Sequence, residues 1–204
     1  MSIHIHRIYT RTGDKGSTAL AGGVKVSKSS LEVESYGESD ELISYLGVVR
    51  AYATTSSTRP SQKIAAETDE TFLKIQNTLY EAGAVLASAS SPAEDADSYD
   101  PTSDSRVAFL EQRIDEYRKL FDAIDGFTIP GESMLEAHAH VARTICRRWE
   151  RVLVRRHENA PIHPWVLAYA NRLSDYLFAY TRWITAQLST AEPLWKGSPP
   201  EDRA

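Results

Sequence analysis

Residues 107–124, VAFLEQRIDEYRKLFDAI, carry the most regular hydrophobic pattern in the chain. The apolar side chains recur at alternating intervals of three and four residues, and they are Val107, Leu110, Ile114, Tyr117, Phe121 and Ile124. This spacing places one apolar stripe on a single face of an α-helix, as in helices that pack lengthwise in bundles. The stretch therefore predicts one helix of a left-handed helical bundle.

Four further segments with helical periodicity extend this prediction along the chain. They span residues 39–57, 62–89, 133–157 and 164–188, and almost nothing after residue 35 alternates like a strand. Pro164 suits the first turn of the last helix, where a missing N–H costs nothing. We therefore expect an all-α fold, a five-helix up-and-down bundle that forms one domain over residues 1–204.

Three segments are expected to lie outside the bundle. Residues 1–35 are rich in Gly, Ser and Lys and predict a loop or arm with one short strand. Residues 90–105 contain five acids, no base and two prolines, which predicts a mobile surface loop. Residues 190–204 predict a flexible tail, apart from Trp195.

Composition limits the class of protein. The 204 residues are 42% hydrophobic and 25% charged, which is enough for one sizeable core. A net charge of −5 argues against a protein that coats nucleic acid or a membrane surface, and no apolar run approaches the roughly 18 residues of a membrane span. The single Cys146 excludes an internal disulfide, and the N-terminus lacks the apolar run of a signal peptide. We expect a cytoplasmic protein.

The stretch YTRTGDKGSTAL, residues 9–20, combines hydroxyl groups, glycines and cations. Gly13 and Gly16 permit close backbone approach, while Arg11 and Lys15 supply positive charge, and this inventory suits phosphate. The spacing is not that of a Walker A loop. Taken alone, the stretch fits a polar turn at least as well.

A second candidate is HVARTICRRWERVLVRR, residues 140–156, which contains six arginines. Helical spacing puts Val141, Ile145, Trp149 and Val152 on one side, and Arg143, Arg147 and Glu150 on the other. A solvated helix face is the ordinary interpretation. However, neighbouring arginines repel one another unless an anion or a carboxylate lies between them, and an Arg fork matches phosphate oxygens well.

Other polar and apolar groups have simple structural interpretations. Ser39 is expected to cap the first helix, with Asp40 and Glu41 favoured by the helix dipole. Asn171 in NRLSD borders an apolar row, and Phe127 in DGFTIPGES is expected to plug the end of the bundle.

Metal chemistry of the ferritin type is excluded. No histidine in the last two helices has a glutamate three residues before it, and His138 and His140 point in different directions on one helix.

Taken together, the motifs resemble one family. YTRTGDKGST, YGESDEL, FTIPGES, RTICRRWER and NRLSD occur in the order and spacing of the PduO-type ATP:cob(I)alamin adenosyltransferases, also called corrinoid adenosyltransferases. The resemblance covers nearly the whole chain. It implies a homotrimer that binds ATP and cobalamin at its subunit interfaces, with Mg²⁺ held through the ATP phosphates rather than by protein ligands.

The resemblance also implies roles for individual residues. The N-terminal loop would wrap the triphosphate, through Thr10, Arg11, Thr12, Gly13, Asp14, Lys15, Gly16 and Ser17, with Lys28 near the phosphates. Further nucleotide-site residues would be Arg147, Arg148, Glu150 and Asn171. Arg143 would pair with Asp40 across the subunit boundary, and Phe127 would lie beneath the corrin ring.

The implied reaction is attack of corrinoid cobalt(I) on C5′ of ATP, giving adenosylcobalamin and triphosphate. A flavin-dependent reductase and an adenosylcobalamin-dependent mutase are the implied partners, and no protein nucleophile is required. The sequence departs from the family at Glu132, where glycine is common, and at Ser39, where an aliphatic residue is common. The alternatives are a non-catalytic carrier that delivers adenosylcobalamin, and a structural helical oligomer.

Overall fold

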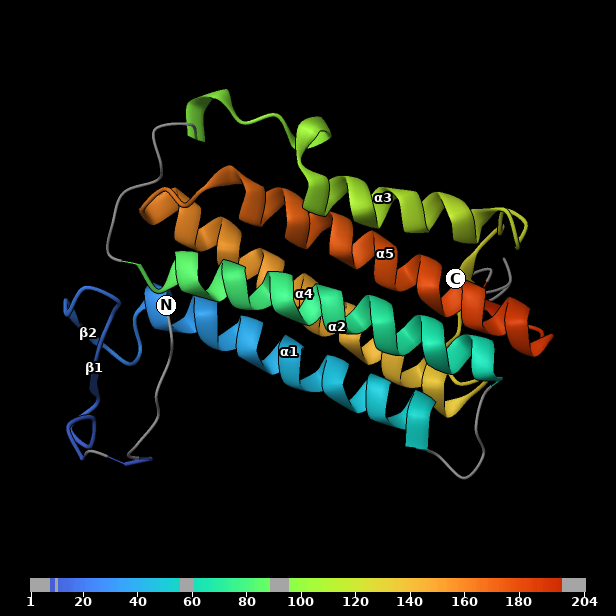
Figure 1. Cartoon of the computed structure of the whole chain (residues 1–204), viewed down its shortest axis with the longest axis horizontal. Coiled ribbons are helices and arrows are strands. Elements are labelled where there is room, and N and C mark those ends of the chain that lie inside the picture. The colour runs from blue at the N-terminus through green and yellow to red at the C-terminus, as the bar shows by residue number, and fades with distance from the viewer. Residues whose placement is uncertain (1–7, 10, 56–60, 89–95, 196–204) are drawn as a thin grey trace, which may run out of the picture.

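The computed structural model describes residues 8–9, 11–55, 61–88 and 96–195. Within them the chain forms five α-helices, which are α1 (Leu31–Thr55), α2 (Gln62–Leu86), α3 (Ser105–Arg118), α4 (Met134–Asn159) and α5 (Pro164–Leu188). Each helix runs opposite to the one before it in sequence (Figure 1). α1 packs against α2 and α4, and α5 packs against α4 and α3. The predicted five-helix bundle is confirmed.

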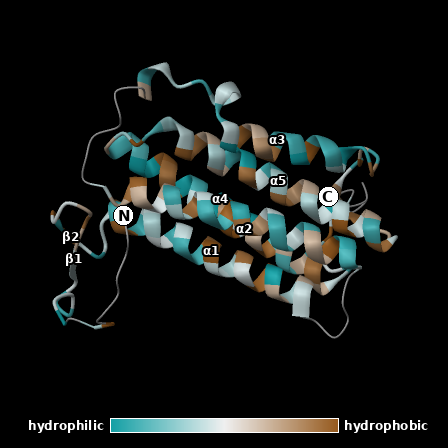
Figure 2. Cartoon of the chain, viewed as in Figure 1, coloured by the Kyte–Doolittle hydropathy of each residue, from teal (hydrophilic) through white to brown (hydrophobic). Residues whose placement is uncertain are grey.

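The core lies where the apolar faces of the helices meet. Hydrophobic and hydrophilic residues alternate around each helix (Figure 2). Trp149 is completely buried, and its indole Nε1–H donates a hydrogen bond of 3.0 Å to the Ser35 carbonyl of α1. The largest fully buried side chains are Leu42, Leu46, Ile64, Phe72, Ile75, Leu79, Leu86, Leu110, Trp149, Tyr169, Tyr176 and Tyr180. Removal of their apolar surface from water is the main driving force for assembling the bundle.

The first helix begins at Leu31, not near residue 39, so the expected capping role of Ser39 is wrong. Ser39 is buried inside α1, and its hydroxyl donates to the Tyr36 carbonyl over 2.8 Å. The acids of the first turn are Glu32 and Glu34. Packing against α4 stabilises this early part of α1, and such tertiary contacts override the local capping signal.

The third helix is shorter than its apolar stripe. α3 ends at Arg118, so Phe121 and Ile124 lie beyond it. Phe121 nevertheless packs against the core, and the Arg182 guanidinium lies 5.1 Å from the centre of its ring. The stripe therefore predicted the packing of Phe121 correctly, although the helix ends three residues before it.

Short strands add order to the segments outside the bundle. β1 (Ser17–Ala19) and β2 (Lys25–Ser27) form an antiparallel hairpin, where one strand was expected. Two short 3₁₀ helices, at Ala96–Ser98 and Pro101–Ser103, lie within the expected mobile loop. β4 (Leu194–Trp195) pairs antiparallel with β3 (Phe127–Thr128), so part of the expected flexible tail is a strand. Residues 196–204 lie outside the described part of the chain.

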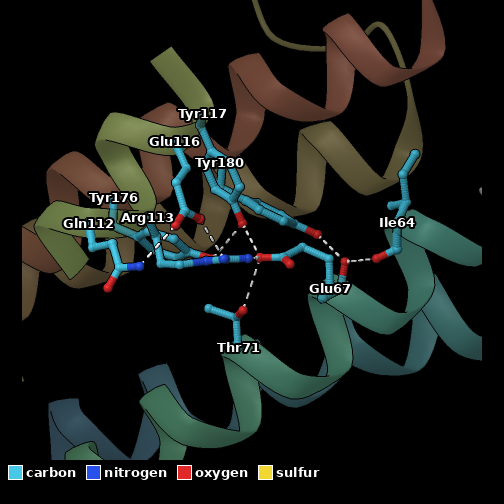
Figure 3. A network of polar contacts seen from close by, with 10 residues as sticks. Ile64, Glu67, Thr71, Gln112, Arg113, Glu116, Tyr117, Tyr176 and Tyr180 are labelled. Carbon is cyan, nitrogen blue, oxygen red and sulfur yellow. Dashed lines mark hydrogen bonds and ion pairs between the residues drawn. The ribbon is translucent and has the colours of Figure 1, made fainter. Parts of the chain in front are cut away.

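A polar network inside the bundle joins α2 to α3 and α5 (Figure 3). The Glu67 carboxylate forms an ion pair with Arg113 and accepts hydrogen bonds from Tyr117 (2.5 Å) and Thr71 (3.0 Å). Arg113 also pairs with Glu116 over 2.6 Å. Since α3 otherwise packs mainly on α5, this network fixes α3 against α2.

Replacing Arg113 with Met should lower the free energy of unfolding by about 1–3 kcal/mol, because a largely buried carboxylate loses its counter-charge. Urea denaturation at pH 7 measures the change. Arg118→Met is the control, since Arg118 is exposed. Equal loss of stability in both variants would contradict the proposed importance of the network.

Alkaline pH should destabilise the fold through Tyr117. Burial raises the pKa of Tyr117 to about 12. Below pH 10 the Tyr117 hydroxyl is neutral in both the folded and the unfolded chain, so its full contribution to the free energy of unfolding is present. As pH rises from about 10 to about 12, the hydroxyl ionises in the unfolded chain but not in the folded one, and the free energy of unfolding falls by roughly 2–3 kcal/mol in total.

Tyr117→Phe should flatten the fall in unfolding free energy over this pH range, measured by urea denaturation at several pH values. Tyr80→Phe, at an exposed position of α2, should leave the fall unchanged. An identical pH dependence in Tyr117→Phe and the parent would exclude this explanation.

Candidate functional site

The N-terminal loop is a compact turn with unusual backbone conformations. Arg11 has φ = 60° and Gly16 has φ = 80°. The Gly16 N–H donates to the Gly13 carbonyl over 3.1 Å, and the Lys28 N–H donates to the Gly16 carbonyl over 2.9 Å. A Cβ atom at Gly13 would lie 3.0 Å from the Lys28 ammonium nitrogen. The absence of a side chain at Gly13 therefore leaves room for the Lys28 ammonium group beside the loop.

Most of the predicted loop residues are open to solvent. Arg11, Thr12, Asp14, Lys15 and Gly16 are exposed, whereas Gly13 and Ser17 are half-buried. Thr10 lies outside the described residues. The loop thus presents cations, hydroxyl groups and backbone N–H groups on one accessible segment, which is a suitable environment for a polyanion.

The hairpin after the loop attaches it to one end of the bundle. Leu20 is buried, and the Ala21 N–H donates to the Ala87 carbonyl just after α2 over 2.9 Å. This end also contains the N-terminus of α1 and the C-terminus of α4 (Figure 1). The loop therefore lies at the end of the bundle where the arginine helix ends (Figure 1).

The six arginines of α4 divide into two groups. Three are paired with acids on α1: Arg148 with Glu38 and Glu41, Arg155 with Glu34, and Arg156 with Glu32. The other three, Arg143, Arg147 and Arg151, form no ion pair with any residue that the structure describes. Half of the arginines are therefore neutralised by α1, and the other half have no counter-charge in the described chain.

Arg143 and Arg147 form a cationic pair one turn apart on α4. Arg143 is half-buried, and its Nε atom has no hydrogen-bond partner among the described residues. Burial lowers the pKa of Arg143, and the positive charge of Arg147 lowers it further. Two adjacent guanidinium groups without a counter-charge in the described chain are suited to binding an anion.

Glu150 and Asn171 lie on the same side of the bundle as this pair. The Asn171 side-chain amide donates to the Glu150 carboxylate over 2.9 Å, which links α5 to α4 one turn beyond Arg147. Arg147 and Glu150, from the motif RTICRRWER, and Asn171, from NRLSD, thus lie on one side of the bundle.

Arg148 points toward α1 instead. Its Nε donates to Glu38 over 2.7 Å, and the hydrogen bonds that Arg148 donates to Glu41 and to Glu38 raise the Arg148 pKa. Within the single chain, the side chain of Arg148 therefore points away from the side of α4 that carries Arg147. Sequence reasoning missed the acidic row of α1 (Glu34, Glu38 and Glu41), although its spacing of four and three residues was a usable signal.

Asp40 is exposed on α1 and forms no ion pair within the described chain, with Arg143 or otherwise. Their expected pairing across a subunit boundary is not tested by one chain.

Phe127 lies at the opposite end of the bundle from the N-terminal loop. It precedes α4, whose 26 residues span about 39 Å at 1.5 Å per residue. Its side chain is 73% exposed, so the interpretation as a buried plug is wrong. The ring centre lies 6.1 Å from that of Trp195 on β4. Within one chain, the loop predicted to bind nucleotide and the residue predicted to contact the corrin ring therefore lie far apart.

A buried carboxylate that sequence reasoning missed holds the turn after Phe127. Glu136 accepts a hydrogen bond from the Gly131 N–H (2.9 Å) and contacts His140 (2.9 Å), while Ser133 caps α4 by accepting from the Glu136 N–H. Burial raises the pKa of Glu136, but the hydrogen bond from His140 and the others outweigh it and hold the pKa below its usual value. The Ser-x-x-Glu capping box was the available signal.

The described residues contain no cluster of three or more His, Cys, Asp or Glu side chains arranged to hold a metal ion, and none of their helices is long and apolar enough to cross a membrane. Cys146 is buried, its thiol donates to the Ala170 carbonyl over 3.4 Å, and burial raises its pKa. It is therefore not a candidate nucleophile.

Known proteins resemble this chain over most of its length. A corrinoid adenosyltransferase of Bacillus subtilis is 42% identical over 181 residues, covering 89% of this chain and 88% of the relative. One from Citrobacter freundii is 39% identical, covering 87% and 94%.

A variant PduO-type ATP:corrinoid adenosyltransferase from Lactobacillus reuteri, solved with cobalamin and ATP, superimposes with a TM-score of 0.78. It is 34% identical, and the match covers 94% of this chain and all of that chain. The family model for cobalamin adenosyltransferase matches residues 8–184. The chain therefore belongs to the cobalamin adenosyltransferase family.

Proposed function

We propose that this chain transfers the 5′-deoxyadenosyl group of ATP to cobalt(I) of a corrinoid. Cobalt(I) donates an electron pair to C5′, the cobalt–carbon bond forms, and the C5′–O bond breaks. The electron pair of the broken bond leaves with triphosphate. The products are adenosylcobalamin and free triphosphate.

The observation that carries this proposal is the cationic pair Arg143 and Arg147. Negative charge grows on the leaving oxygen as the C5′–O bond breaks, and guanidinium groups held in place beforehand stabilise it most. Arg147 is the accessible member and would bind the triphosphate. Glu150 and Asn171, joined to each other beside it, would orient the rest of the nucleotide.

The N-terminal loop supplies the other half of the nucleotide site. Lys15, Lys28, the hydroxyl groups and the backbone N–H groups near Gly13 and Gly16 would surround the phosphates. Mg²⁺ would enter with ATP and be held through its phosphate oxygens, which is its usual mode in nucleotide sites. It would neutralise part of the charge on the leaving group.

A homotrimer with its sites between subunits is the assembly that we propose. The length of α4 keeps the loop and Phe127 of one chain apart, so a site that uses both draws them from two copies. Asp40 and Arg143, oppositely charged and without ion-pair partners in the described chain, are suited to pair across this boundary and fix its geometry.

Phe127 would lie beneath the corrin ring. An axial ligand makes cobalt(II) harder to reduce, because it raises the orbital that accepts the electron. An exposed apolar ring at this position would exclude water and the nucleotide tail of cobalamin. The protein thus positions and desolvates the reactants, whereas the difficult chemistry belongs to cobalt.

The partners follow from this chemistry. A flavin-dependent reductase would supply the electron to cobalt(II), and an adenosylcobalamin-dependent mutase would use the product. We expect the enzyme to act in the cytoplasm.

Anaerobic incubation with ATP, Mg²⁺ and reduced cobalamin tests the reaction. We expect a light-sensitive cobalt–carbon bond and one triphosphate per adenosylcobalamin. Binding of both substrates without triphosphate release would indicate a carrier and would overturn the proposal.

Arg147→Ala should lower kcat at least tenfold, which corresponds to about 1.4 kcal/mol of transition-state stabilisation. Arg155→Ala is the matched control, because Arg155 is exposed on the same helix but paired with Glu34. The rate of adenosylcobalamin formation is the measurement. Equal rates in the two variants would refute the placement of Arg147.

Phe127→Ala should retain ATP affinity and lose most activity when cobalt(II) is reduced on the enzyme. The same variant supplied with chemically prepared cobalt(I)alamin should lose much less, because no reduction step remains. A parallel loss with both substrates would contradict the role given to Phe127.

A further inference from the structure

The strand that carries Phe127 has few attachments of its own. Within the described residues, β3 packs chiefly against β4, through the pairs Phe127 with Trp195 and Thr128 with Leu194. The next N–H, of Ile129, donates to the Pro193 carbonyl over 2.9 Å. The position of Phe127 therefore depends on the segment 189–195, here called the strap.

Gly126 shows how closely β3 and the strap approach. Its φ is +137°, and a Cβ atom there would lie 2.9 Å from the Trp195 carbonyl oxygen. Only a residue without a side chain fits between the two backbones without displacing one of them.

The strap is held to α5 by a buried ion pair. The Glu192 carboxylate is 5% exposed and pairs with Arg182, whose side chain is 11% exposed. The Thr185 hydroxyl donates to the same carboxylate over 2.8 Å. Arg182 in turn lies over the ring of Phe121, in the segment that follows α3. Only Pro193 lies between Glu192 and Leu194, which is the first strap residue that pairs with β3.

Apolar packing around the ion pair is incomplete. A cavity of about 290 Å³ lies beside the strap, lined by Phe121, Ile124 and Leu194 together with residues of α5 and the strap itself. A buried ion pair is a weak source of net stability, because desolvation offsets its attraction, but its geometry is specific. Its function here is therefore better explained by positioning than by stability.

We propose that Arg182 and Glu192 are positioning residues that act through the strap to hold Phe127 against the corrin. The proposal rests on the proposed function of Phe127. It concerns a segment beyond residue 184, where the match to the family model ends.

The test compares Glu192→Ala, Phe127→Ala, the parent and a control, all as the full chain in its native assembly. The control is Glu111→Ala, which removes another carboxylate paired with an α5 arginine, Arg172. Each variant is assayed for ATP affinity, for adenosylation from cobalt(II)alamin reduced on the enzyme, and for adenosylation from prepared cobalt(I)alamin. The fraction of bound cobalt(II)alamin without an axial ligand is measured by electron paramagnetic resonance with ATP present.

Glu192→Ala should slow adenosylation from cobalt(II)alamin about fivefold or more and lower the ligand-free fraction, with ATP affinity unchanged. The rate from cobalt(I)alamin should change by less than about twofold. Gly126→Ala, which disturbs the contact between β3 and the strap but leaves the ion pair intact, should show the same pattern.

Two results would overturn the inference. The first is that Glu192→Ala and Gly126→Ala have the rates and the ligand-free fraction of the parent while Phe127→Ala is impaired. This result would refute the positioning role of the ion pair but not the proposed function of Phe127. The second is equal loss of ATP affinity and of both rates, which would indicate a general structural role. Parental behaviour of Phe127→Ala itself would instead refute the proposed function of Phe127, and the positioning role with it.

Discussion

The distribution of positive charge around α4 is the constraint on which the structure depends. Three arginines face α1 and are neutralised by its acidic row together with Glu32, so the same ion pairs that join the two helices also determine how α4 is rotated. That rotation leaves Arg143 and Arg147 on the opposite side, close to each other and without counter-charge in the described chain. Their repulsion is tolerable when an anion binds or when a neighbouring subunit supplies an acid.

The length of the bundle has a second consequence. The loop that suits phosphate and the exposed aromatic that suits a corrin ring lie at opposite ends of α4, with the cationic pair between them. One copy of the chain therefore contains all the parts of the proposed site, but not in one place. Assembly of copies is then a requirement of the chemistry that we propose, since the cobalt and C5′ must approach within bonding distance.

Much of this could be predicted from the sequence, because helical periodicity and local motifs are short-range signals. The apolar stripes gave the helices, and the order of the motifs indicated the family. The errors arose where distant contacts decide the outcome. α1 begins early because Trp149 and Ser35 meet, and part of the expected flexible tail is a strand because it pairs with β3. The ion pairs of Arg148 with acids over one hundred residues away were missed for the same reason. Neither periodicity nor capping rules contain that information.

The central claim is that a triphosphate is bound by the N-terminal loop of one subunit and the cationic pair of another. The most direct test is co-expression of Lys15→Ala with Arg147→Ala under two affinity tags, followed by isolation of the mixed trimers. We predict that activity returns, because about a third of the sites in a mixed trimer would combine an intact loop with an intact arginine from different chains. Mixed trimers as inactive as each variant alone would show that both residues serve a site within one chain, and would contradict the account.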